Sequence, residues 1–306
     1  MHSPVTGPST WRWVADELAA RGHRVAVPAI PPAATALGWA AFVGAVGALS
    51  AGIDNPVLVG HSGAGPLLPR IGARIKARAL IFVDADIPPE DGETTLVPGE
   101  FLEVLRGLAS GGFLPPWSDW FGPDSFQELI PDEQARRIVS AELPALPLSY
   151  FEARVPVPIG WTSTRSGYIL LSEAYAEQAS KAEASSWPVA RLPGAHLDIV
   201  TRPAEIADAI LSIAADLSVA GQSGAGERAA GEQVSKEPVA GLQVAAGSVA
   251  GGSVAAQQVA GRQAAEEPAA GQQVAAGSVA SKQAAGKQAA ERVRRGRIGR
   301  RGRRTP

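Results

Sequence analysis

Short, uninterrupted apolar runs alternate with amphipathic stretches along the first 217 residues of the chain. An apolar run of strand length is typical of a strand buried on both faces of a parallel sheet, whereas apolar residues three and four positions apart are typical of a helix. The predicted strands are residues 23–28, 56–61, 78–84, 168–171 and 188–192. The predicted helices are residues 9–21, 37–51, 65–76, 173–184 and 203–217. This alternation predicts an α/β fold, with a mostly parallel sheet and helices on both faces.

Residues 87–160 interrupt the alternation and form a predicted insertion between two strands of the sheet. They are rich in proline, glycine and aromatic residues. An insertion at this place is where a lid over a binding site would sit, and its aromatic side chains could line a pocket. The same side chains could instead do no more than pack the insertion onto the sheet.

The composition changes near Leu217, where we place the end of the folded domain. All seven Trp, all seven Phe and all three Tyr precede residue 188. Residues 1–217 carry 15 Lys and Arg against 24 Asp and Glu, a net charge of −9. Residues 218–306 carry 13 against 6, a net charge of +7. A near-neutral total therefore divides into an acidic domain and a basic tail.

The tail itself is of low complexity. Residues 236–250 recur in similar form at 266–280, and the repeat is too poor in large apolar side chains to bury a core. We therefore predict that the tail is disordered. Its last residues, 291–306, hold eight arginines among glycines. Such a segment could bind polyanions weakly and without specificity, or could be a solvated end without function.

Composition also excludes several kinds of site and location. The chain has no cysteine, which rules out disulfides, thiolate metal sites and a cysteine nucleophile. No apolar run approaches the ~18 residues that a membrane-spanning helix needs, and no signal peptide opens the sequence. We expect a cytoplasmic protein that acts on a small-molecule substrate, without a cofactor, a metal or a membrane partner.

The most informative motif is Gly-His-Ser-Gly-Ala-Gly at residues 60–65, which follows the apolar run 56–59 and precedes a predicted helix. A serine between small residues on a tight strand-to-helix turn is the pattern of a nucleophile elbow. The small residues are needed because strand and helix close on each other at the turn. The hydroxyl of Ser62 would then stand above the sheet, and the N–H of Gly63 would be placed to stabilise an oxyanion.

With this motif, the first 217 residues resemble the α/β-hydrolase superfamily, in particular small actinobacterial-type members. The resemblance is strongest at 56–84 and 187–217. It implies a catalytic histidine in the loop after the last strand, where this chain has His196 in the sequence Leu-Pro-Gly-Ala-His. It also implies the chain order of serine first and histidine later, which Ser62 and His196 satisfy.

The resemblance leaves the acid of the triad open between three residues. The common location is the turn after the strand that follows the lid, where this chain has Glu173. The other location in this fold is the end of the strand after the nucleophile helix, where Asp84 and Asp86 lie. We favour Asp84, then Glu173, then Asp86. Asp84 could also be a strand-end residue that only bonds loop amides.

The resemblance also implies a second oxyanion donor from the loop after a central strand, often marked by His-Gly. This chain has His2-Ser3 at that place, followed by Pro4, which has no N–H. Ser3 or Val5 would have to supply the donor. The apolar strand expected before His2 is absent from the sequence, which has two interpretations: the true start lies upstream of Met1, or the product is truncated and lacks a central strand.

These features predict a serine-dependent hydrolase of a small ester, amide or related acyl substrate. Ser62 would attack, His196 would act as general base and then acid, and Asp84 or Glu173 would orient it. One alternative is a truncated or non-catalytic binding protein of the same fold. A second is a dinucleotide-binding oxidoreductase, because three glycines open a helix after a strand and Asp84 ends the next strand.

Overall fold

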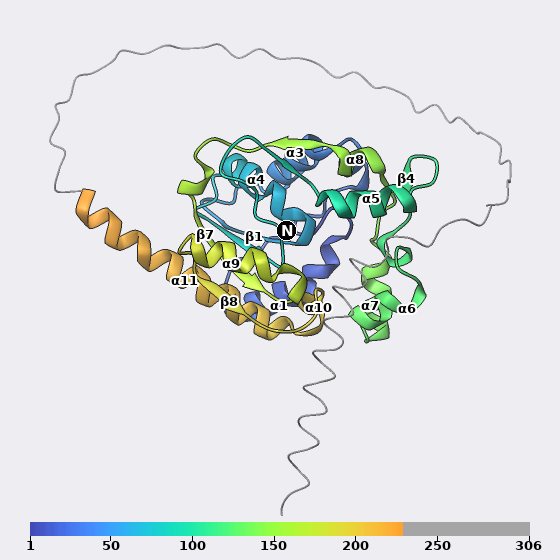
Figure 1. Cartoon of the computed structure of the whole chain (residues 1–306). Helices are drawn as coiled ribbons and strands as arrows, with labels where there is room; N and C mark the ends of the chain where they lie inside the picture. The colour runs from blue at the N-terminus through green and yellow to red at the C-terminus, as the bar shows by residue number, and fades with distance from the viewer. Residues whose placement is uncertain (229–306) are drawn as a thin grey trace, which may run out of the picture.

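The computed structural model describes residues 1–228, and its centre is a sheet of four strands (Figure 1). The strands lie in the order β1 (Val57–His61), β2 (Ala79–Val83), β7 (Arg165–Leu170) and β8 (Val189–Arg191). Each neighbouring pair is parallel. The predicted parallel sheet is therefore present, and its strands fall within one to three residues of the predicted bounds.

Strand β2 shows why the sequence has continuous apolar runs instead of alternating ones. All of its residues are buried. Successive side chains of a strand point to opposite faces of the sheet. Leu80 and Phe82 accordingly enter one apolar cluster, whereas Ile81 and Val83 enter another on the opposite face. Both faces of the sheet are covered, so each position must be apolar.

Two groups of helices supply these covers (Figure 1). Residues from α3 (Trp39–Leu49), α4 (Leu68–Ile75) and α9 (Ala176–Ala184) join the cluster around Phe82. Residues from α1 (Arg12–Ala20) and α11 (Pro203–Arg228) join the cluster around Ile81. The model thus has helices on both faces, as an α/β fold requires.

The predicted insertion lies between β2 and β7 in the chain and contains its own small elements. Its helices α5, α6, α7 and α8 gather on one side of the molecule in Figure 1. Two short antiparallel ribbons, β3 with β6 and β4 with β5, tie it together. The bounds are β3 (Glu93–Thr95), α5 (Gly99–Leu108), β4 (Phe113–Leu114), η3 (Trp117–Asp119), α6 (Pro123–Leu129), α7 (Glu133–Ser140), β5 (Leu146–Pro147), α8 (Leu148–Glu152) and β6 (Arg154–Pro156).

The predicted strand at 23–28 is wrong, because these residues form neither strand nor helix. A strand needs a neighbour for its backbone groups. On the outer edge of β1, Met1 bonds backbone groups to which a neighbouring strand would pair. Its amino group donates to the carbonyl of Val59 at 2.6 Å, and its carbonyl accepts from the N–H of His61 at 3.2 Å. Residues 23–28 are left without a strand to pair with, and Val25 is 40% exposed.

Several predicted helices also differ in extent. The helix predicted at 37–51 is α3, which begins directly after Gly38, whose φ is 102°, and a short helix that was not predicted, α2 (Pro32–Ala36), precedes it. The helices predicted at 65–76 and 173–184 each begin with a 3₁₀ turn, η2 (Ser62–Leu67) and η5 (Glu173–Tyr175). Helix α11 continues 11 residues past its predicted end at Leu217. The rest of the predicted disordered tail and its arginine-rich end lie outside the described residues.

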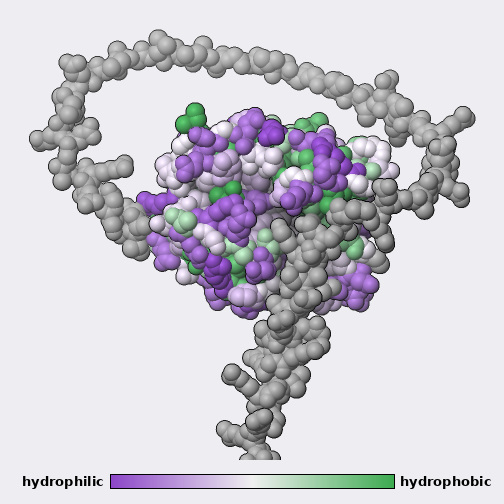
Figure 2. All heavy atoms as spheres, in the orientation of Figure 1, coloured by the Kyte–Doolittle hydropathy of each residue, from purple (hydrophilic) through white to green (hydrophobic). Residues whose placement is uncertain are grey.

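The visible surface is mostly hydrophilic, with smaller hydrophobic areas between the charged side chains (Figure 2). Within residues 1–228, no helix has both the length and the apolar character needed to cross a membrane.

Candidate active site

Ser62 lies on a strained turn between β1 and the 3₁₀ helix η2. Its φ of 56° is in the left-handed region, which non-glycine residues seldom adopt. The turn is also tight. A Cβ on Gly60 would lie 2.5 Å from the Leu68 side chain, and one on Gly65 would overlap the carbonyl oxygen of Asp86. The small residues of the motif are therefore required by close packing.

Three side chains form a continuous hydrogen-bonded series at this turn. The Ser62 Oγ lies 2.9 Å from His196 Nε2, and His196 Nδ1 lies 2.7 Å from Asp84 Oδ2. They come from three different loops at the carboxyl ends of parallel strands: Ser62 follows β1, Asp84 follows β2 and His196 follows β8. If Asp84 accepts from Nδ1–H, Nε2 is free to accept the Ser62 proton.

Asp84 is fully buried, and its charge is balanced by several donors. Its Oδ1 accepts from the N–H groups of Leu171 and Ser172, both at 2.9 Å, and its Oδ2 accepts from the Ser172 hydroxyl at 2.5 Å. A buried carboxylate needs such donors to offset its lost hydration. Asp84 therefore faces His196 and the end of β7, and it is not placed to reach a ribose as the dinucleotide interpretation requires.

The other two candidate acids lie elsewhere. Glu173 is exposed in η5. Asp86 accepts from the side-chain amide of Gln178 at 3.0 Å. Of the three carboxylates considered from the sequence, Asp84 is the one that contacts His196.

Aromatic rings surround the imidazole of His196, which is 18% exposed. Tyr175 stacks on it with ring centroids 5.3 Å apart, and Trp117 of the insertion meets it edge-on at 6.3 Å. His61 lies on another side with its centroid at 4.5 Å, and its Nε2 is 2.8 Å from the His196 carbonyl oxygen. Burial holds the pKa of His61 well below its usual value, so a neutral His61 can donate this bond.

Sequence reasoning did not single out Tyr175, His61 or Ser172. The available signal for Tyr175 was an aromatic residue within a few positions of the end of the strand that follows the insertion. Trp117 falls only under the general expectation that aromatic residues of the insertion could line a pocket.

The loop predicted to carry a second oxyanion donor lies beside Gly63. A Cβ on Gly63 would lie 2.9 Å from Ser3 Oγ and 3.4 Å from Pro4 Cδ. The loop is held in place because the Ser3 carbonyl accepts from Thr6 N–H at 3.0 Å. Val5 is half-buried against the apolar cluster and is not among the atoms nearest to that point.

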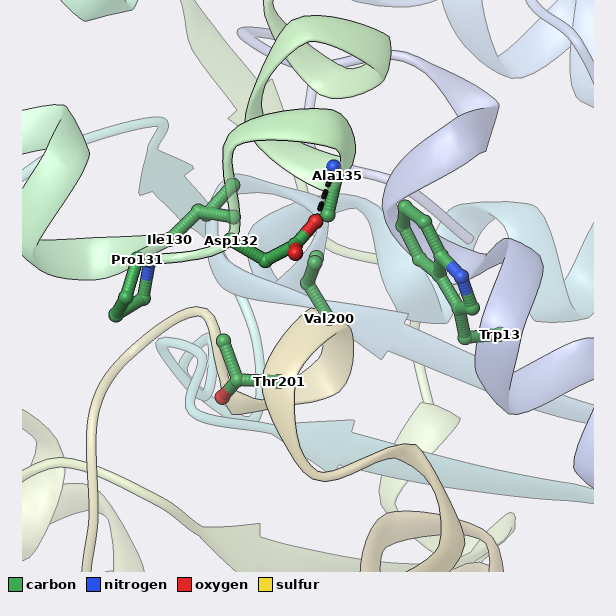
Figure 3. Close-up of a pocket in the computed structure, with 7 residues that line it drawn as sticks. All are labelled: Trp13, Ile130, Pro131, Asp132, Ala135, Val200 and Thr201. Carbon is green, nitrogen blue, oxygen red and sulfur yellow. Dashed lines mark hydrogen bonds between the residues drawn. The ribbon is translucent and has the colours of Figure 1, made fainter.

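Two hollows on the described surface are lined by residues other than Ser62, Asp84 and His196. One of about 340 Å³ is lined by Trp13, Val200, Thr201 and residues 130–132 and 135 (Figure 3). Its one carboxylate, Asp132, accepts from Ala135 N–H at 2.7 Å and so caps helix α7. In the described part of the chain, no cluster of three or more His, Asp or Glu side chains could hold a metal ion.

Solved structures of similar fold include an extracellular alpha/beta-hydrolase from a Paenibacillus species, described as a structural and functional homologue of tobacco salicylic acid binding protein 2. It is 17% identical, with a TM-score of 0.58, over 70% of this chain and 96% of that one. The pyrethroid hydrolase PytH is 18% identical, with a TM-score of 0.54, over 70% and 94%. A variant of tomato methylketone synthase I is 14% identical, with a TM-score of 0.55, over 71% and 96%.

A search of curated proteins found no match. The family model described as "Alpha/beta hydrolase family" matches residues 2–209, which include all three members of the hydrogen-bonded series. The chain therefore belongs to the alpha/beta hydrolase family.

Proposed function

We propose that this protein is a serine-dependent hydrolase of a small ester, amide or related acyl substrate. The observation that carries the proposal is the series Ser62–His196–Asp84, with its 2.9 Å and 2.7 Å contacts. A serine becomes a useful nucleophile when a base takes its proton and a third group orients the base. These three residues have the geometry for those roles, and Ser62 and His196 both keep some solvent exposure.

In the proposed reaction, Ser62 Oγ bonds to the substrate carbonyl carbon while its proton passes to His196 Nε2. The electron pair of the C=O bond moves onto oxygen. When that pair returns, the bond to the leaving group breaks, and the leaving group takes the proton from His196. Water then attacks the acyl-serine in the same manner, which releases the acid and restores Ser62. Asp84 stabilises the imidazolium formed in each half.

The oxyanion would be stabilised by Gly63 N–H and by a donor from the loop at Ser3. Gly63 directly follows the nucleophile, where backbone N–H groups of this fold point at the developing charge. Pro4 has no N–H to give, and Ser3 is the loop residue whose side chain approaches Gly63 most closely. Among the similar structures, PytH is named as a pyrethroid hydrolase, which agrees with hydrolysis but does not identify this protein's substrate.

Hydrolysis of p-nitrophenyl acetate and butyrate by the full chain tests this proposal. We expect turnover by the parent protein and its loss in Ser62→Ala. Ser180→Ala is the matched control, because that exposed hydroxyl only bonds the carbonyl of Ala176 in its own helix. Equal turnover by parent and Ser62→Ala would contradict the proposal.

A second candidate function is non-catalytic ligand binding on the same fold. It is favoured by Pro4, which removes one backbone donor beside the nucleophile. A correctly folded parent protein that hydrolyses neither ester and forms no adduct with an acyl-enzyme probe would support this candidate.

A further inference from the structure

His61, the last residue of β1, joins the strand that leads to the nucleophile to the loop that carries His196. The residue is 1% exposed, and its Nε2 lies 2.8 Å from the backbone carbonyl oxygen of His196. The centroids of the two imidazole rings are 4.5 Å apart. Because Ser62 directly follows His61 in the chain, this one residue links the position of the nucleophile to the position of its base.

The direction of this hydrogen bond follows from counting protons. A backbone carbonyl only accepts, so Nε2 of His61 must carry a proton. Burial holds the pKa of His61 well below its ordinary value, and the neighbouring His196 lowers it further, so the ring is neutral at pH 7 and has a single N–H. His196 takes the opposite tautomer, with its proton on Nδ1 toward Asp84 and a lone pair on Nε2 toward Ser62.

The His61 side chain is itself held in place by the start of the chain. Its backbone N–H donates to the Met1 carbonyl at 3.2 Å, and the indole N–H of Trp11 donates to the same carbonyl at 2.9 Å. The indole ring stands perpendicular to the His61 ring, with centroids 6.5 Å apart. A close-packed side chain of this kind has little freedom to change its rotamer. His61 is therefore a fixed donor.

The loop that carries His196 is held on both sides of that residue. On the amino side, the N–H of Gly194 donates to the Leu171 carbonyl at the end of β7, at 2.7 Å. On the carboxyl side, the His196 carbonyl accepts from His61. The imidazole is also bound to Asp84 through Nδ1, but a side chain bound at its ring alone still tilts when its backbone shifts. The bond from His61 fixes that backbone.

We propose that His61 is a positioning residue of this site: its Nε2–H donates to the backbone carbonyl of His196 and holds the imidazole within hydrogen-bond distance of Ser62. The inference rests on the proposed serine-hydrolase function. His61 is too deeply buried to contact a substrate, so it acts only through His196. Catalytic geometry is sensitive to small displacements, and a shift of about 1 Å can cost ~100-fold in rate.

A neutral His61 also suits the charge that His196 acquires during the reaction. When His196 takes the proton of Ser62, it becomes an imidazolium beside the His61 ring. A second positive charge at that distance would oppose the transfer. The neutral ring avoids this repulsion, and its proton stays on Nε2 throughout acylation and deacylation.

Two substitutions separate the hydrogen bond from the space that the side chain fills. His61→Phe keeps a buried ring but has no donor. His61→Gln loses the ring but places an amide N–H the same number of bonds from Cβ as Nε2 of the histidine, so it can donate to the same carbonyl. His23→Gln is the matched control, because His23 is exposed just after α1. The assay is the second-order rate constant for modification of the full-length protein by a fluorophosphonate, with kcat and KM for p-nitrophenyl acetate. Thermal unfolding shows that each variant is folded.

We expect His61→Phe to lower the modification rate constant and kcat about tenfold or more with little change in KM. His61→Gln should recover most of that loss, and His23→Gln should match the parent. Parent-like rates in folded His61→Phe, or an equal loss in His61→Gln, would overturn the inference. A parent that reacts at Ser62 together with an unaffected His61→Phe refutes this inference alone, whereas a folded parent that does not react refutes the serine-hydrolase proposal as well.

Ring-nitrogen NMR of the full-length protein labelled with ¹⁵N-histidine tests the hydrogen bond without an activity assay. The chain has four histidines, and the signals lost in His61→Gln identify those of His61. We expect a neutral ring with its proton on Nε2 at pH 7. A proton on Nδ1 alone, or a charged ring, would overturn the inference. This measurement decides the matter if the His61→Phe protein does not fold.

Discussion

Replacing Asp84 by asparagine changes the charge and proton pattern of the site while keeping its shape. The amide oxygen of the new side chain could still accept from Leu171 and Ser172, which now donate to Oδ1. Its NH₂ group would then face His196 Nδ1 in place of the carboxylate oxygen at 2.7 Å. Because an NH₂ group only donates, Nδ1 would have to accept, and the imidazole proton would move to Nε2.

That tautomer points N–H at Ser62 and removes the base. In a serine protease, the equivalent change lowers kcat by ~10⁴, or about 5 kcal/mol in activation free energy, and we expect a loss of ~10³ to 10⁴ here. The fold should survive. Two backbone N–H groups change from a charged to a neutral acceptor, and the Ser172 hydroxyl, which donates to Oδ2 in the parent, would have to turn and accept from the new NH₂ group. We expect these changes to cost about 1–3 kcal/mol in the free energy of unfolding.

The assay compares p-nitrophenyl ester hydrolysis and urea unfolding for the parent, Asp84→Asn and Glu173→Gln. Glu173 is the matched control, because its exposed carboxylate lies in η5, next to Ser172, and does not contact His196. A folded Asp84→Asn protein with parent-like turnover would refute the argument. So would a loss in Glu173→Gln as large as that in Asp84→Asn.

Three further changes test the turn, the loop beside it and the support of Asp84. Gly65→Ala should destabilise the fold by about 1–3 kcal/mol, because its Cβ would overlap the Asp86 carbonyl oxygen; an unchanged thermal midpoint would contradict this. Burial lowers the pKa of His2 to about 4, so the unfolded chain binds more protons below pH 6.5, and stability falls as the pH falls from about 6.5 to 4. We expect His2→Gln to reduce the fall in the free energy of unfolding between pH 7 and pH 4.5 by up to about 3 kcal/mol, measured by urea unfolding at both pH values. The same pH dependence in the variant and the parent would show that His2 is not its source. Ser172→Ala removes the hydroxyl that donates to Asp84 and should lower kcat about tenfold in the ester assay, whereas parent-like kcat would show that this donor is dispensable.

The sequence was sufficient to predict features that depend on local pattern. The apolar run of β2 and the small residues around Ser62 reflect burial on two faces and a tight turn, and both constraints act on neighbouring positions. Residues 23–28 have the same local pattern but form no strand. Pairing depends on a partner edge elsewhere in the fold, which a local pattern does not contain.

The residues of the candidate site likewise fall into those that the sequence predicted and those that it did not. The placement of Ser62 and His196 followed from motifs and chain order, and the structure brings the two together. The sequence favoured Asp84 over Glu173 but left both open, because the acid depends on which strand end faces the imidazole. The stacked Tyr175 and the donors at Leu171 and Ser172 were missed for the same reason. N-terminal truncation, the role of the arginine-rich end and the cytoplasmic location stay predictions.

Intact-mass analysis of the full-length protein after treatment with a fluorophosphonate tests the central claim most directly. The account predicts a single adduct on the parent and none on Ser62→Ala, because only a serine activated by His196 and Asp84 reacts at an appreciable rate. The same adduct on Ser62→Ala, or no adduct on a parent shown to be folded by its thermal unfolding transition, would contradict it.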